Sequence, residues 1–301
     1  MANPLSREHS SFFYIFLIIL QGLIFGIGNP IVKFAYETIT PIWCLAIRFT
    51  AATLIFIIPF GKKAIQELRA TKMHFWFPTA ICMAAAYITS NVGLNLTTAT
   101  SVGFLMSLPI VFTPFLSKLI LKRKIHKAFL PVPIIAIAGL YLISLNGGSF
   151  HFGLGEGLSL CCSIAMAGAL VWGEEGLNHL SATTISLVQL LVTAIASTVC
   201  ALCLEPMLNL SAIAPKAWLV ILYLVIFCSC LCYIFQNIAL SHISSAVVAL
   251  TQCGEPLFTA AASFFILGER LSPPGFFGAA LLILCIIYGN YIENKTQVPQ
   301  P

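Results

Sequence analysis

The feature that most constrains the fold of this sequence is a succession of long apolar runs with almost no polar sequence between them. About 20 apolar residues in a helix cross the roughly 30 Å hydrocarbon core of a bilayer. Only 8% of the residues are charged and 59% are hydrophobic, so a soluble domain of this composition would lack the polar surface to cover itself. The ten runs cover approximately residues 12–33, 40–60, 74–94, 99–120, 128–146, 155–174, 183–204, 216–240, 244–267 and 274–291. We therefore predict an all-α integral membrane protein with ten transmembrane helices and the lipid bilayer as its solvent.

The basic residues between the runs predict an orientation. Short loops rich in Lys and Arg stay on the cytoplasmic side. One side collects Lys62, Lys63, Arg69, Lys72, Lys118, Lys122, Arg123, Lys124 and Lys127, together with both chain ends. The other side holds only Lys33, Lys216 and Arg270. We expect a multi-pass protein of the plasma (inner) membrane with its N- and C-termini in the cytoplasm.

The chain also repeats itself. Moving the sequence by 146 residues places "YITSNVGLNL" (87–96) on "YIFQNIALSH" (233–242), so that Tyr87 matches Tyr233 and Asn91 matches Asn237. Each half then holds five runs, and because five is odd the second half enters the membrane upside down. The prediction is two inverted five-helix repeats, residues 12–146 and 155–291. Transporters built in this way place their substrate near the midplane, between the repeats.

One carboxylate lies inside an apolar run, in "ALTQCGEPLFTAA" (249–261), directly before a proline. An ionisable residue at this depth costs a few kcal/mol and normally faces a cavity or a partner. Pro256 removes a backbone donor and disrupts the helix at this point. Glu255 is therefore either part of a binding site or a structural group that caps the broken helix. Its counterpart in the first half, "SLPIVFTPF" (107–115), keeps the proline at Pro109 but has no carboxylate.

Three stretches resemble a known family. These are "FGIGNPIVK" (25–33), "AIRFTAA" (46–52) and "GEPLFTAAASFFILGERLSPPGFFGAALLI" (254–283). They are similar to motifs of the drug/metabolite transporter superfamily, EamA-type branch, and the resemblance extends over residues 12–291. It implies a carrier for amino acids, other small metabolites, drugs or nucleotide sugars. Two departures put any particular substrate in doubt: the second-half Gly268-Glu269-Arg270 is Lys122-Arg123-Lys124 in the first half, and Phe25 replaces the usual tryptophan.

The candidate substrate-binding residues are polar or aromatic side chains within the runs. Amides in membranes often only hold helices together, and aromatic rings often anchor at interfaces. Midplane sites at repeat interfaces favour a binding role for some of them. The candidates are Asn29, Tyr87, Asn91, Trp172, Tyr233, Asn237 and Glu255.

Other residues are candidates for structural or gating roles. Arg48 belongs to a motif that the resembling family keeps irrespective of substrate, so we interpret it as a structural lock; the alternative is recognition of a carboxylate. Lys33 and Glu174 stand near the ends of corresponding runs, where they either reach the interface or form a gating salt bridge. Pro109 and Pro256 are the expected helix breaks.

The predicted function is secondary transport of a small polar or amphipathic metabolite by alternating access, with export as the expected direction and Glu255 as a candidate for proton coupling. Nucleotide-binding motifs are absent, so we expect no direct use of ATP and no cofactor. Most of the eleven cysteines lie in apolar runs and are interpreted as packing residues, without a metal site. We expect no nucleic-acid partner and no enzyme activity, and the oligomeric state is not indicated. The alternatives are a membrane-embedded enzyme, a channel and a non-transporting sensor.

Overall fold

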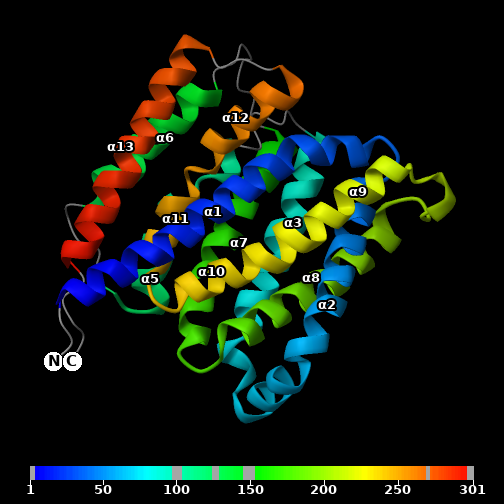
Figure 1. Ribbon diagram of the computed structural model, residues 1–301, viewed down its shortest axis with the longest axis horizontal. Coiled ribbons are helices and arrows are strands. Elements are labelled where there is room, and N and C mark those ends of the chain that lie inside the picture. Colours follow the sequence, from blue (N-terminus) through cyan, green and yellow to red (C-terminus); the bar gives the residue numbers. More distant parts are fainter. Residues whose placement is uncertain (1–3, 97–103, 124–128, 145–152, 269–271, 297–301) are drawn as a thin grey trace.

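The computed structural model describes residues 4–96, 104–123, 129–144, 153–268 and 272–296, and these residues form helices and turns without a strand (Figure 1). The longer helices are α1 (Pro4–Tyr36), α2 (Pro41–Ala70), α3 (Phe77–Leu96), α5 (Pro109–Ile120), α6 (Pro131–Ser144), α7 (Leu154–Leu177), α8 (Ala182–Leu204), α9 (Pro215–Tyr223), α10 (Cys232–Leu240), α11 (Ser245–Gln252), α12 (Glu255–Leu267) and α13 (Pro273–Thr296). A π-helical segment, η4 (Leu224–Leu231), joins α9 to α10, and short 3₁₀ turns lie at η1 (Met73–Phe75) and η3 (Leu210–Ala212).

Proline starts many of these helices. It is the first residue of α2, α5, α6, α9 and α13, and the second residue of α12. Proline is well suited to the first turn because its φ is already helical and the missing N–H would have no partner there. Glycine ends one of them: Gly268 follows α12 with a φ of +70°, a left-handed conformation that favours glycine.

Six helices are long and apolar enough to cross a membrane, and the segments Phe104–Ile120 and Pro131–Ile143 are shorter apolar helices. The third expected run holds α3, and the ninth is divided into α11 and α12. The protein is therefore a multi-pass, all-helical membrane protein.

The second helix is longer than the sequence suggested. We expected it to end near residue 60, before Lys62, but α2 continues to Ala70. A helix that leaves the bilayer keeps its internal hydrogen bonds in water. Lys63 pairs with Glu67 one turn later at 3.6 Å, and Ala64 stays buried. The extension is thus an amphipathic end of the same helix.

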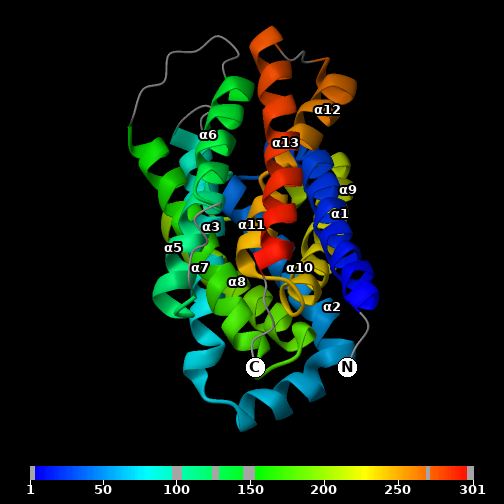
Figure 2. The ribbon, with the colours of Figure 1, turned by 90° about the vertical axis from the view of Figure 1, so that its left-hand side faces the viewer.

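The helices pack in a bundle in which the start of α1 and the end of α13 point toward the same end, the lower one in Figure 2. We call this end the terminal side and the opposite end the far side. Helix α2 packs on α8, α6 packs on α13, and α3 packs on α7. Helix α1 runs along α9 and α10 on one flank and along α12 on the other (Figure 1).

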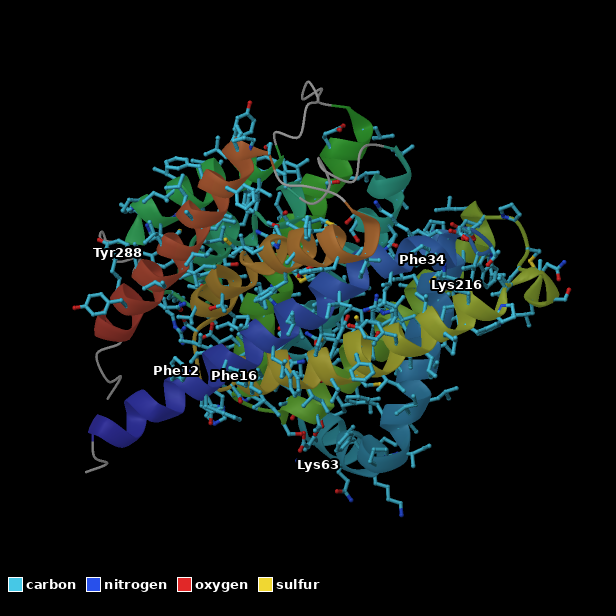
Figure 3. All side chains as sticks on the ribbon, turned by 45° about the horizontal axis from the view of Figure 1, so that its top comes forward. Phe12, Phe16, Phe34, Lys63, Lys216 and Tyr288 are labelled. Carbon is cyan, nitrogen blue, oxygen red and sulfur yellow. The ribbon has the colours of Figure 1, made fainter. Side chains whose placement is uncertain are left out.

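The outer surface of the bundle is apolar. Phe12, Phe16 and Tyr288 lie on it and are about half exposed or more (Figure 3). Single exposed apolar residues are ordinary on soluble proteins, but a continuous apolar coat is expected where lipid replaces water. Small residues allow close helix contacts inside: a Cβ at Gly278 would lie 2.5 Å from the carbonyl oxygen of Gly139, where α13 meets α6.

Helices α2 and α8 are joined by hydrogen bonds at both of their ends. At each end, a carboxylate at the end of one helix binds the start of the other. On the terminal side, Glu67 accepts hydrogen bonds from the backbone N–H and the hydroxyl of Ser181, at 2.9 and 2.8 Å. At the other end, Glu205 accepts from the N–H groups of Ile42 and Trp43, at 3.0 and 2.9 Å. The first N–H groups of a helix have no partner within it, so each carboxylate satisfies such donors and complements the helix dipole.

Candidate functional site

A cavity of about 440 Å³ lies inside the bundle, within the range of small-molecule sites. Its lining comes from α1, α3, α7, α12 and several other elements, so both halves of the chain contribute. The lining residues of α1 all lie between Gln21 and Tyr36, in the half of that helix away from the N-terminus. At the far side the lining reaches Lys33, Asn91 and Ile143. The cavity therefore extends from the middle of the bundle toward its far side.

Glu255 lines this cavity at a break between two helices. Helix α11 ends at Gln252, and α12 begins at Glu255 after a turn. Pro256 and Pro109 have the same local role, since each stands at the start of a helix that follows a break. The carboxylate thus sits at a helix N-terminus, where free N–H groups and the helix dipole favour negative charge.

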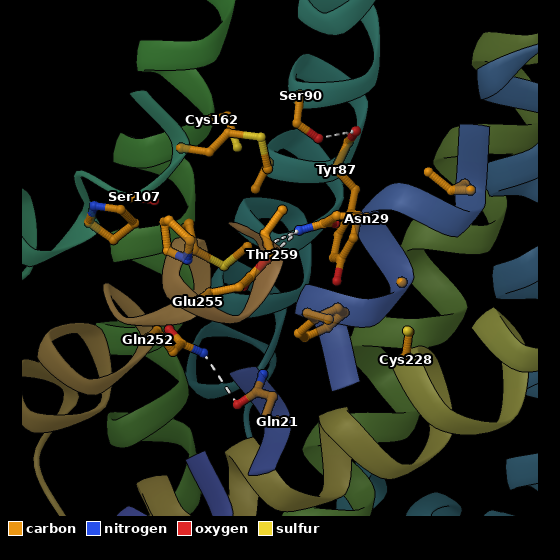
Figure 4. A pocket seen from close by; sticks show the side chains of 18 of the residues that line it. Gln21, Asn29, Tyr87, Ser90, Ser107, Cys162, Cys228, Gln252, Glu255 and Thr259 are labelled. Carbon is orange, nitrogen blue, oxygen red and sulfur yellow. Dashed lines mark hydrogen bonds between the residues drawn. The ribbon is translucent and has the colours of Figure 1, made fainter. Parts of the chain in front are cut away.

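One amide connects Glu255 to the first helix. The Nδ2 atom of Asn29 donates to Glu255 Oε1 at 2.9 Å and to Thr259 Oγ1 at 3.1 Å (Figure 4). This contact requires α1 to approach α12 closely. A Cβ at Gly26 would lie 2.5 Å from Phe258 Cβ and 2.9 Å from the backbone nitrogen of Thr259. Gly26 is therefore the residue that lets Asn29 reach the carboxylate.

Arg48 lies beside the aromatic wall of the cavity, which consists of Tyr36, Tyr87 and Tyr233. Its Nε donates to Ser229 Oγ in η4 at 2.7 Å, and its side chain is only 9% exposed. The guanidinium carbon lies 5.2 Å from the ring centre of Phe49 and 5.6 Å from that of Tyr87. These are distances at which a cation and a ring attract each other. Arg48 thus ties α2 to η4 and α3, although it also lines the cavity.

Tyr87, Tyr233 and Asn91 lie at this wall as well. The two tyrosine rings are stacked with their centres 6.3 Å apart. The Asn91 Oδ1 atom accepts from the hydroxyl of Tyr36 at 3.0 Å. All four side chains line the cavity. The pair of tyrosines that the repeat aligns therefore meets in space.

Two of the sequence candidates do not line the cavity. Asn237 is fully buried, and its Nδ2 donates to Ser186 Oγ and Gln189 Oε1, both at 2.9 Å. These bonds hold α10 against α8. Trp172 is half-buried on α7, away from the lining residues.

The floor of the cavity is a polar layer of three glutamines, none of which was among the predicted substrate contacts. Gln21 Nε2 donates to Gln236 Oε1 at 3.1 Å, and Gln252 Nε2 donates to the same oxygen at 2.9 Å. Three glutamines from α1, α10 and α11 thus meet, and Figure 4 shows Gln21 and Gln252 of this group. The available signal was weak: Gln21 and Gln252 are single amides in apolar runs, and Gln236 reads equally well as a contact between helices.

Below this floor, the terminal side is closed by contacts among α5, α7 and α11. Glu174 forms an ion pair with Arg123, which follows α5. The same carboxylate accepts from the backbone N–H of Ser245 at 2.9 Å, and Ser245 Oγ lies 3.0 Å from Ser117 Oγ. Glu174 is 8% exposed. We call Ser117, Arg123, Glu174 and Ser245 the closure. Lys33 lies at the opposite end of the bundle, so it does not pair with Glu174.

Among the described residues, no group of three or more His, Cys, Asp or Glu side chains could hold a metal ion. The cavity offers one carboxylate, two basic side chains (Lys33 and Arg48), several amides and hydroxyls, and aromatic rings. Such a lining can bind a polar molecule.

Comparisons with known proteins agree with this arrangement. An uncharacterized transporter of Archaeoglobus fulgidus is 27% identical over 89% of this chain and 82% of its own length. The riboflavin transporter ImpX of Fusobacterium nucleatum is 24% identical over 78% of this chain and 83% of its own length. A solved crystal structure shares the fold with a TM-score of 0.79 at 15% identity, covering 96% of this chain and 99% of that one.

The family model of the EamA-like transporter family matches the chain twice, over residues 12–145 and 153–290. Together the two matches cover most of the protein, and the relatives with curated names are transporters. The chain is a multi-pass membrane transporter and belongs to the EamA-like transporter family.

Proposed function

We propose that this protein is a secondary transporter that moves a small polar or amphipathic metabolite across the plasma membrane by alternating access, with net export. The observation that carries this proposal is the position of the cavity, whose lining extends from the three glutamines to Lys33 and Asn91 at the far side and includes no residue of the closure. A carrier needs a site that is open to one side while the other side is closed. With both termini in the cytoplasm, the present state faces outward.

The helix contacts support ten spans in two inverted repeats. In the proposed repeat, α1, α3 and α5 correspond to α7, α10 and α12. The contact of α3 with α7 then corresponds to that of α10 with α1, and the contact of α5 with α7 corresponds to that of α12 with α1. All four contacts occur. Two pairs of helices that would exchange with each other also pack together, namely α2 with α8 and α6 with α13. An inverted repeat has two related arrangements of the same contacts, which is the structural basis of alternating access.

The closure is the part that opens when the cavity turns to the cytoplasm. Its contacts join the ends of α5, α7 and α11, and Glu174 is shared between Arg123 and Ser245. Both bonds are charge-assisted and stronger than neutral ones, so the closed terminal side is stable without substrate. In the inward-facing state these bonds are exchanged for bonds to water.

The substrate class that fits this lining is an amino acid or a related small metabolite. Glu255 and Arg48, of opposite charge, both line the cavity, together with the aromatic rings of Tyr36, Tyr87 and Tyr233. Asn29, Tyr87, Asn91, Tyr233 and Glu255 are the proposed substrate contacts. One relative is named for riboflavin, a larger amphipathic compound, so riboflavin belongs in the same test panel.

Proton coupling through Glu255 is part of the proposal. A carboxyl group that takes up a proton on one side of the membrane and releases it on the other links transport to the proton gradient. Transport by purified protein in liposomes is then expected to vary between about pH 5 and pH 8. Glu255→Gln, which keeps the hydrogen-bonding shape but cannot ionise, is expected to remove this dependence. A pH profile that is equal in both proteins contradicts the coupling role.

The transport function is tested in two steps. A thermal-shift screen of amino acids, amines, nucleosides and riboflavin finds compounds that raise the stability of purified protein, because ligands that bind only the folded state stabilise it. The compounds found are then tested for saturable flux and counterflow in liposomes. Counterflow supports a carrier. Binding without flux, or flux that does not saturate, contradicts the proposed mechanism.

A further inference from the structure

The glutamine floor has hydrogen-bonding capacity beyond what its own members use. Three carboxamides offer six N–H donors and three carbonyl oxygens. Gln236 Oε1 accepts from both neighbours, and Gln252 Nε2 also donates to Gln21 Oε1 at 3.4 Å. Within the described parts of the chain, Gln236 Nε2 and Gln252 Oε1 have no hydrogen-bond partner. The floor therefore has a donor and an acceptor to spare.

These two groups are placed to meet a ligand. Gln21 and Gln236 are only 3% and 5% exposed, yet all three glutamines line the cavity. A polar group that leaves water without a new partner costs a few kcal/mol. A bound molecule that covers the floor must therefore form hydrogen bonds with the unpaired donor and acceptor. If it does not, its binding free energy is less favourable by this cost.

The floor is uncharged, and it offers both a hydrogen-bond donor and an acceptor. It has no charged side chain, whereas Glu255 lies one turn of chain beyond Gln252 at the start of α12. A neutral group that carries a carbonyl acceptor beside an N–H donor matches both spare groups at once. Amides and cyclic imides have this edge, and a tertiary amide or an N-alkylated imide lacks the donor.

We propose that Gln21, Gln236 and Gln252 form a second subsite of the cavity, which binds the neutral amide or imide edge of the transported molecule. This proposal rests on the proposed function, because it names the part of the substrate that the same cavity holds. The carboxylate of Glu255 then contacts another part of the molecule. The subsite sorts substrates by a donor–acceptor pair, independently of their net charge.

A purely structural role of the glutamines predicts something different. The triad joins α1 to α10 and α11, so its removal would lower stability whichever compound is present. The chain offers a matched control for that effect. Gln189 is fully buried and bonds to Thr79 at 2.8 Å and to Asn237, but it is not a lining residue.

The experiment measures binding of matched probe pairs to purified full-length protein. The probes are nicotinamide with N,N-dimethylnicotinamide, and uracil with 1,3-dimethyluracil. Wild type is expected to bind at least one parent compound about tenfold more tightly than its alkylated partner, which is the effect of one unsatisfied buried group. Gln236→Met and Gln252→Met are expected to lose this preference, and Gln189→Met is expected to keep it.

Three results would overturn the subsite: equal binding within both pairs, a preference that survives in Gln236→Met and Gln252→Met, or no binding of either parent compound at millimolar concentration. If the methionine variants fail to fold, the comparison of each probe with its alkylated partner on wild type still decides. Flux in liposomes is measured separately. Saturable flux of a screened metabolite, without a preference for the parent amides or imides, supports the transport function and contradicts only the subsite. A preference for the parent compounds without any flux supports the subsite as a binding site and contradicts the transport function.

Discussion

Two regions of the bundle are held together in opposite ways. The α2–α8 pair is fastened at both ends, by Glu67 at Ser181 and by Glu205 at the start of α2. The closure around Glu174 joins α5, α7 and α11 on the terminal side, and the cavity extends from the glutamine floor toward the far side of the same bundle. A pair that is fastened equally at both ends has no preferred side to open. We therefore propose that α2 and α8 form a static frame, and that the ends of α5, α7 and α11 move during transport.

The largest expected effect is at Gly26, where α1 meets α12. Gly26→Ala places a methyl group against the backbone of Phe258 and Thr259, which cannot shift as a flexible side chain can. Overpacking of this kind costs about 1–3 kcal/mol or more. We expect a large fall in thermal stability and loss of ligand binding. Gly157→Ala is the control, because nothing lies within 4 Å of a Cβ there, and a fall of equal size in that variant would contradict the assignment.

The next effect is at the closure. Glu174→Gln removes the ion pair with Arg123 and weakens the bond to Ser245, so the terminal side should open more often. The measurement is alkylation of a cysteine introduced at Ala249, a lining residue, by a reagent that cannot cross the membrane. We expect several-fold faster alkylation from the terminal side.

The control for this variant is Glu175→Gln. That carboxylate receives a local bond from Asn178, at 3.4 Å, and takes no part in the closure. It should leave the alkylation rate unchanged. An equal rate for the Glu174 variant and wild type would mean that Glu174 does not keep the terminal side shut.

The smallest effect is expected in the static frame. Glu67→Gln and Glu205→Gln each weaken bonds to unpaired N–H groups at a helix start, at a cost of about 1 kcal/mol. Both should lower thermal stability by similar amounts, and neither should change the side from which the Ala249 position is alkylated. Glu37→Gln, at an exposed position, serves as the control for loss of charge. A change of accessible side in either frame variant would place the α2–α8 pair among the moving parts.

The sequence predicted the apolar helices because hydrophobicity is a local property that bilayer thickness translates directly into length. It also predicted the helix breaks before Pro109 and Pro256, since proline acts on its own helix. The carboxylate clamps could not be predicted, because Glu67 and Ser181 are 114 residues apart and nothing in either segment specifies the other. Asn237 shows a different limit: its helix was expected, but which face of the helix points to the cavity depends on packing.

If transport requires the closure to open, a reversible cross-link across the closure must stop transport. The hydroxyls of Ser117 and Ser245 are 3.0 Å apart, so cysteines at both positions are close enough to form a disulfide. Each single-cysteine variant is the control for the native cysteines. We predict that oxidation of the double variant stops counterflow, that ligand binding persists, and that reduction restores counterflow. Undiminished counterflow in fully cross-linked protein would show that the closure does not need to open.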